Sequence, residues 1–72
     1  MDSLRLGNRL RVARAEQRLS QEQLAVMAGV TRQTISSIEN GQYTPSALLA
    51  FVLADRLGKP VNELFYLDGN AP

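Results

Sequence analysis

Residues 21–40 constrain the fold of this chain most, because they read as two short helices joined by one tight turn. Gly29 fits the left-handed conformation that ends a helix and turns the chain. Ile35 and Ile38 mark the buried side of the second helix. The first helix has an apolar edge at helical spacing, formed by Leu24, Ala25 and Ala28. The stretch therefore predicts a helix-turn-helix unit.

The outer side of the second helix is polar. At about 100° per residue, five hydrogen-bonding side chains fall opposite the two isoleucines: Arg32, Gln33, Ser36, Ser37 and Asn40. Short or fork-shaped groups of this kind bond well to base edges in the major groove. We interpret this face as a DNA-reading surface. A merely solvated helix face is the alternative, and the residue types alone do not exclude it.

Composition restricts the chemistry that the chain can perform. Its 72 residues include no cysteine and no histidine, which excludes thiol nucleophiles, zinc sites of the usual kind and the commonest general base. A domain of this size buries only about 60% of the surface of its unfolded chain, so little room remains for an enzyme cleft. We therefore expect one domain over residues 1–72, no enzyme activity, no metal, no cofactor and no evident small-molecule ligand.

The longest apolar run, residues 47–54, is far shorter than the run of about 20 residues that spans a bilayer. This predicts a cytoplasmic protein with no membrane partner. The net charge is +1, but residues 1–18 carry +3 and residues 19–72 carry −2. The basic first segment is compatible with phosphate attraction, and a solvated arginine-rich helix fits it equally well.

Further helices are expected on both sides of residues 21–40. Leu6, Leu10 and Ala13 recur at helical spacing and predict a helix over about residues 3–18. Ser20 and Gln23 form a capping-box pattern in front of the helix that begins at Gln21.

Proline positions suggest where the later helices begin. Thr44 and Pro45 look like the cap and first position of a helix that runs to Leu57. Pro60 begins a short helix through about Leu64, and residues 68–72 read as a frayed tail.

Arg14 lies one turn beyond Leu10 and therefore borders the buried stripe of the first helix. An unpaired guanidinium there would be costly, so an acidic partner is expected, and Glu39 is the candidate. Arg11 and Arg18 lie on the outer side of the same helix and are expected to be solvated.

Residues 47–54 are apolar nearly all round, which a peripheral helix of a small monomer cannot bury by itself. A second subunit is the simplest cover, so we predict a homodimer through residues 46–67. The expected interface residues are Leu48, Val52, Phe65, Tyr66 and Leu67.

The pattern Gln21-x-x-Leu-Ala-x-x-Ala-Gly-Val-Thr-Arg-Gln-Thr-Ile-Ser-x-Ile-Glu-Asn-Gly41 strongly resembles the helix-turn-helix of the phage repressor and Cro family. This family is also called the xenobiotic-response-element (XRE) family of bacterial regulators. The likeness extends from Asn8-Arg9-Leu10 to Glu63-Leu64-Phe65. It implies an all-α, lambda-repressor-like bundle of five helices, with the second motif helix in the major groove.

Some short stand-alone members of the family pair their terminal segments as a small β-ribbon. The alternation at Leu4-Arg5-Leu6 and the run Phe65-Tyr66-Leu67 could supply such strands here.

The resemblance also implies roles for individual residues. Arg32, Gln33 and Ser37 match positions that touch bases in relatives, and Ser36 shares their face. Arg14 and Glu39 match a buried structural ion pair. The resemblance also implies contacts to the DNA backbone from Gln21, Thr34 and Asn40. Further candidates for such contacts, which do not rest on the resemblance, are Thr31, Gln42 and Tyr43. For Thr34, Gln42 and Tyr43, a purely structural role is about equally compatible with the sequence.

We therefore predict a transcriptional regulator that binds double-stranded DNA in a sequence-specific manner, a repressor acting as a homodimer on a palindromic operator. The alternative is an antitoxin or other protein-interaction module, for which DNA binding is secondary. Its tail would be short for wrapping a toxin.

Overall fold

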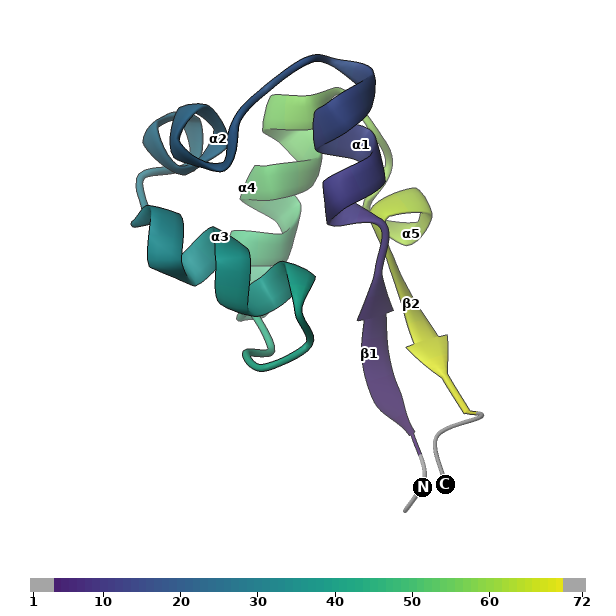
Figure 1. Ribbon diagram of the computed structural model, residues 1–72. Coiled ribbons are helices and arrows are strands. Elements are labelled where there is room, and N and C mark those ends of the chain that lie inside the picture. Colours follow the sequence, from purple (N-terminus) through teal and green to yellow (C-terminus); the bar gives the residue numbers. More distant parts are fainter. Residues whose placement is uncertain (1–3, 70–72) are drawn as a thin grey trace.

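The computed structural model describes residues 4–69, in which five helices form one body and two short strands project from it as a ribbon (Figure 1). The helices are α1 (Leu10–Glu16), α2 (Gln21–Ala28), α3 (Arg32–Glu39), α4 (Ala47–Leu57) and α5 (Val61–Leu64). The strands are β1 (Arg5–Asn8) and β2 (Phe65–Asp68). Within the described residues, no helix has the length and apolar character needed to cross a membrane.

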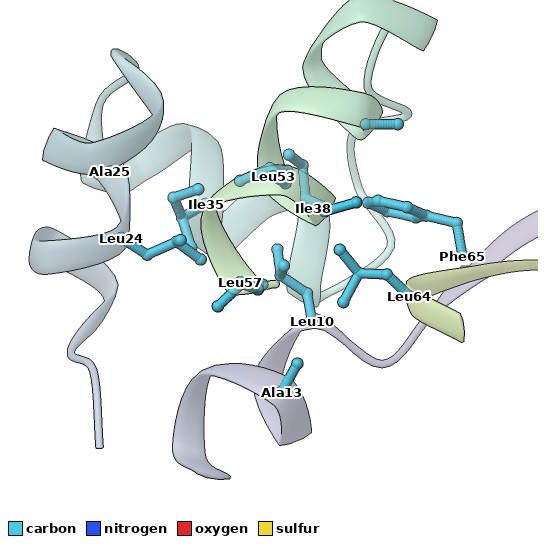
Figure 2. Close-up of a cluster of buried hydrophobic side chains, with 12 residues drawn as sticks. Leu10, Ala13, Leu24, Ala25, Ile35, Ile38, Leu53, Leu57, Leu64 and Phe65 are labelled. Carbon is cyan, nitrogen blue, oxygen red and sulfur yellow. The ribbon is translucent and has the colours of Figure 1, made fainter. Parts of the chain in front are cut away.

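The core draws on every helix of the described part of the chain. Its most deeply buried large side chains are Leu10, Leu24, Ile35, Ile38, Leu53 and Leu64. Figure 2 shows these side chains pointing toward one another, with Phe65 closing one end of the cluster. Burying a side chain of this size stabilises a fold by about 1.5–3 kcal/mol. The predicted apolar stripes of α1, α2 and α3 thus meet in one place.

The helix predicted over residues 3–18 is shorter than expected at both ends. Asn8 is the last residue of β1 and marks the change from strand to helix. Its Oδ1 accepts a hydrogen bond from the Leu10 amide at 3.0 Å, and its Nδ2 donates to the Ile38 carbonyl at 2.9 Å. At the other end α1 stops at Glu16, and Arg18 adopts a left-handed φ of 57°. Residue 3 lies outside the described residues.

β1 and β2 form the antiparallel terminal ribbon that the resemblance suggested, with Leu6 opposite Leu67 and Gly7 opposite Tyr66. The Tyr66 ring lies over Gly7 so closely that a Cβ at this position would overlap it. The Arg9 guanidinium sits 4.4 Å from the centre of the same ring. The fold is therefore a five-helix, repressor-like bundle with a small β-ribbon, and Asp68 belongs to the ribbon rather than to a frayed tail; residues 70–72 lie outside the described part.

Both proline-based helix starts are wrong by one or two residues. α4 is capped by Ser46, whose Oγ accepts from the Leu49 amide at 3.1 Å, while Pro45 is buried in the preceding loop. Pro60 is likewise the cap of α5 rather than its first helical residue. Ser46 and Thr44 are both good caps by type, and the hydrogen bond from the Leu49 amide identifies Ser46 as the cap.

Candidate nucleic-acid interface

Local hydrogen bonds fix the start of α2 and the turn between α2 and α3. Ser20 and Gln23 form the predicted capping box, with the Ser20 amide donating to Gln23 Oε1 at 2.7 Å and the Gln23 amide to Ser20 Oγ at 3.0 Å. Gly29 ends α2 at a φ of 73°, which L side chains rarely adopt. Thr31 then caps α3 by accepting from the Thr34 amide at 3.1 Å. The sequence thus fixes the start of α2 and, through Gly29 and Thr31, both ends of the turn.

The outer face of α3 carries the predicted base-reading residues. Arg32 and Gln33 are exposed, and Ser36 and Ser37 are half-buried beside them. Gln33 Nε2 donates to Ser37 Oγ at 3.3 Å across one turn of the helix. Because Ile35 and Ile38 are fully buried behind this face, the polar side chains are directed away from the core.

A surface hollow of about 310 Å³ lies beside this face. It is lined by Gln33, Thr34, Ser37, Gln42 and Tyr43. The loop holds its place because the amides of Gln42 and Tyr43 both donate to the Ser37 carbonyl, at 2.8 and 3.2 Å. The fold therefore brings together residues from α3 and the following loop that were predicted separately for bases and backbone.

Arg14 and Glu39, predicted as a pair, form an ion pair. The Glu39 side chain is completely buried, and Arg14 donates to its two carboxylate oxygens at 2.8 and 3.3 Å. Arg14 also donates to the Leu19 carbonyl at 2.8 Å. The ion pair ties the end of α3 to α1 and to the loop before α2.

Two further side chains join Arg14 on this carboxylate. Gln21 Nε2 donates to Glu39 Oε1 at 3.1 Å, and Arg11 Nε lies 3.4 Å from the same oxygen. We refer to Arg11, Arg14, Gln21 and Glu39 as the carboxylate cluster. Burial by itself raises the pKa of Glu39, but the hydrogen bonds from Arg14 and Gln21 and the charge of Arg14 outweigh it, so the pKa lies below its ordinary value of 4.5.

The cluster reaches residues predicted to contact DNA. Arg32 Nη1 lies 3.5 Å from Gln21 Oε1, and Arg11 Nη2 donates to Asn40 Oδ1 at 3.0 Å. The expectation that Arg11 is merely solvated is therefore wrong. Its spacing of three residues from Arg14 was the available signal, because residues three apart share one side of a helix.

Comparison with known proteins agrees with this geometry. A helix-turn-helix family model matches residues 10–64, which include every helix of the described part. The chain belongs to this helix-turn-helix family, of the Cro and XRE type.

Similar proteins of this family occur in both archaea and bacteria. An uncharacterised helix-turn-helix transcriptional regulator of Methanocaldococcus jannaschii is 47% identical over 60 residues, which cover 83% of this chain and 91% of that protein. One from Bacillus subtilis is 39% identical over 63 residues, covering 88% of this chain and 96% of that protein. The likeness therefore does not indicate a specifically bacterial source.

The restriction-modification controller protein C.AhdI of Aeromonas hydrophila has a similar solved structure, with a TM-score of 0.73 and 36% identity over 76% of this chain and 80% of that one. The chain is thus a transcriptional regulator with a helix-turn-helix DNA-binding domain. The names of its family and relatives are those of DNA-binding regulators, not of enzymes.

In this helix-turn-helix regulator, the residues expected at a subunit interface lie in different environments. Leu48 and Leu67 are 75% and 72% exposed, Tyr66 is partly exposed and Val52 is half-buried. Phe65 is only 7% exposed and belongs to the core, so in the single chain it is closed to a partner. Phe51, which was not among the predicted interface residues, is 61% exposed. Its position three residues after Leu48 places both side chains on one side of α4.

Proposed function

We propose that this regulator is a sequence-specific repressor that binds double-stranded DNA as a homodimer on a palindromic operator. The observation that carries the proposal is the outer face of α3, where exposed polar side chains stand on a helix anchored by Ile35, Ile38 and the carboxylate cluster. A reading helix needs this combination, because base contacts depend on side chains held at fixed positions.

Arg32 and Gln33 are the main base-reading residues in this proposal. Both are exposed near the start of α3, the part of a recognition helix that contacts base edges. Arginine bonds to guanine and glutamine to adenine through two hydrogen bonds, each such pair giving about 1–3 kcal/mol of discrimination. Ser36 and Ser37, lower on the same face, add shorter contacts.

The backbone of the DNA would be held around the rim of this face. Gln21 stands at the start of α2, where unpaired amides and the helix dipole favour an anion. Asn40 caps the end of α3. The remaining proposed backbone contacts are Thr31, Thr34, Gln42 and Tyr43, three of which line the hollow beside α3.

A second copy of the chain is proposed to cover the apolar side of α4. Leu48 and Phe51 are both more than half exposed there, which is unusual for large apolar side chains on one helix face. A symmetric dimer through residues 46–67 would place two copies of α3 in successive major grooves, about 34 Å apart. Occupancy of such a site blocks access of polymerase to the promoter.

Selection of binding sites from random DNA with the purified protein tests this function. We expect a palindromic site, with affinity that falls as salt increases. Arg32→Ala or Gln33→Ala should remove the preference for that site while the helical circular dichroism stays unchanged. Asn40→Ala, by contrast, should weaken binding to all sequences about equally. Unchanged selectivity in the Arg32 and Gln33 variants would overturn the assignment of base readers.

The exposed apolar side of α4 also favours a second candidate, an antitoxin or other interaction module whose main partner is a different protein. Size-exclusion chromatography with light scattering separates the two. A stable homodimer with operator binding supports the repressor, whereas a monomer that selects no DNA sequence supports the interaction module.

A further inference from the structure

We propose that Arg11 is a further DNA-positioning residue, which orients the Asn40 side chain toward a phosphate and supplies the positive charge that this phosphate meets. The inference rests on the proposed DNA binding by α3. It concerns a residue of α1, outside the helix-turn-helix itself.

The geometry joins Arg11 to two neighbouring residues at the end of α3. Its Nη2 donates to Asn40 Oδ1 at 3.0 Å, and its Nε lies 3.4 Å from Glu39 Oε1. A guanidinium has its donors in a rigid plane, so two contacts are enough to fix its direction. Arg11 is therefore held at the corner where α1 meets the C-terminal end of α3.

These contacts determine which atoms Asn40 offers to a ligand. The amide oxygen of Asn40 accepts from Arg11, and both of its N–H groups remain available. A phosphate only accepts hydrogen bonds, so the nitrogen is the atom that must face it. Without Arg11, the two orientations of the amide would be far closer in energy.

The electrostatics of this corner also require a cation. The C-terminal end of a helix carries a partial negative charge that repels phosphate, and Glu39 adds a full negative charge. Arg14 balances the carboxylate from the buried side, where its side chain is 16% exposed. Arg11 is then the excess positive charge, and its side chain is 61% exposed.

The contacts of Arg11 are expected to contribute little to the stability of the fold. Ion pairs of an exposed side chain contribute about 0–1 kcal/mol. If Arg11 is removed, Glu39 keeps its bonds to Arg14 and Gln21. Loss of Arg11 should therefore affect DNA binding without a matching effect on folding.

The test compares Arg11→Gln with the wild type on the operator selected by the wild-type protein, over a series of salt concentrations. We expect a loss of affinity of about tenfold at low salt. The slope of log affinity against log salt should fall by about 0.9 for each protomer bound, the change expected when one phosphate contact is lost. The thermal midpoint should stay within about 4 °C of the wild type, which corresponds to a surface change of about 0.5 kcal/mol in a domain of this size.

Two matched variants separate positioning from charge. Arg18→Gln removes an equal charge from an exposed residue just after α1 and should leave the salt slope unchanged. Arg11→Lys keeps the charge and should therefore keep the salt slope. Asn40→Ala should cost less DNA affinity in the Arg11→Lys protein than in the wild type, because an ammonium lacks the planar fork that orients the Asn40 amide. The inference is overturned if the salt slope is unchanged in Arg11→Gln, or if it is reduced in Arg11→Lys. Failure of the wild type to select any DNA site would instead overturn the proposed function itself.

Discussion

Helices α3 and α4 are built alike on the inside and differ on the outside. Both begin at a hydroxyl cap, Thr31 and Ser46, and both bury an apolar stripe in the same core. Outside, α3 presents arginine, glutamine and serine, whereas α4 presents leucine and phenylalanine. The same folding requirement thus leaves each helix a free face, and the chemistry of that face fits nucleic acid in one case and protein in the other.

The largest effect on stability is expected from substitutions in the buried faces of the two helices. Ile35→Ala in α3 and Leu53→Ala in α4 should each lower the free energy of unfolding by about 2–5 kcal/mol, because both side chains are fully buried. Urea denaturation measures the change. Val26→Ala, at a residue that is 72% exposed on α2, is the control and should change stability by less than about 0.5 kcal/mol. A much smaller loss for Ile35→Ala would mean that α3 is not anchored by the core.

The second difference is that the buried carboxylate of Glu39 holds the end of α3 in place. Glu39→Gln removes its charge from between Arg11 and Arg14 and should cost about 2–3 kcal/mol at neutral pH. The pKa of Glu39 is lowered in the folded protein, so the unfolded chain binds the proton more readily.

The stabilisation from Glu39 is therefore present above its ordinary pKa of 4.5 and is lost as the pH falls through the lowered value. Denaturation curves of the wild type and Glu39→Gln should converge across this acidic range. A constant difference at all pH values would contradict the role given to the charge.

Exchanging the chemistry of the outer faces tests the comparison directly. Leu48→Glu on α4 should dissociate the proposed dimer, since a buried leucine contributes about 1.5–3 kcal/mol and each symmetric interface contains two. Ser37→Glu on α3 should instead prevent DNA binding by repelling phosphate, with the dimer intact. Sedimentation and DNA titration are measured for both variants. If Leu48→Glu remains dimeric, the outer face of α4 is not the subunit interface.

The smallest effect is expected at the caps. Thr31→Ala and Ser46→Ala each remove a hydrogen bond of 3.1 Å to a backbone amide and should cost about 1 kcal/mol. The matched variants Thr31→Ser and Ser46→Thr keep the acceptor oxygen and should remain close to the wild type in thermal unfolding. If Thr44→Ala proved as costly as Ser46→Ala, the start assigned to α4 would be wrong.

Sequence reasoning was most accurate where the signal is local. The capping box and Gly29 fix α2 within a few residues of chain, and the predicted bounds agree with the structure. The start of α1 could not be found in this way, because Leu6 and Leu10 fit a helix while Leu4 and Leu6 fit a strand equally well. The choice is made by pairing with β2, which is distant in sequence.

The candidate site shows the same limit. The polar face of α3 follows from helical periodicity, and the Arg14–Glu39 pair followed from the cost of burying a lone charge. The contact of Arg11 with Asn40 depends on how α1 crosses the end of α3, which no local pattern contains. Phe65 was assigned to an interface because an apolar residue fits a core and an interface alike, and only the packing decides.

The pairing of β1 with β2 has a consequence for the order in which the molecule assembles. β1 precedes every described helix and β2 follows them all, so the ribbon closes a loop that contains the entire helical body. Contacts between such distant segments form slowly, because loop closure costs entropy before pairing compensates it. During synthesis, β1 therefore stays unpaired until β2 has left the ribosome, and the contact between Tyr66 and Gly7 can form only after that.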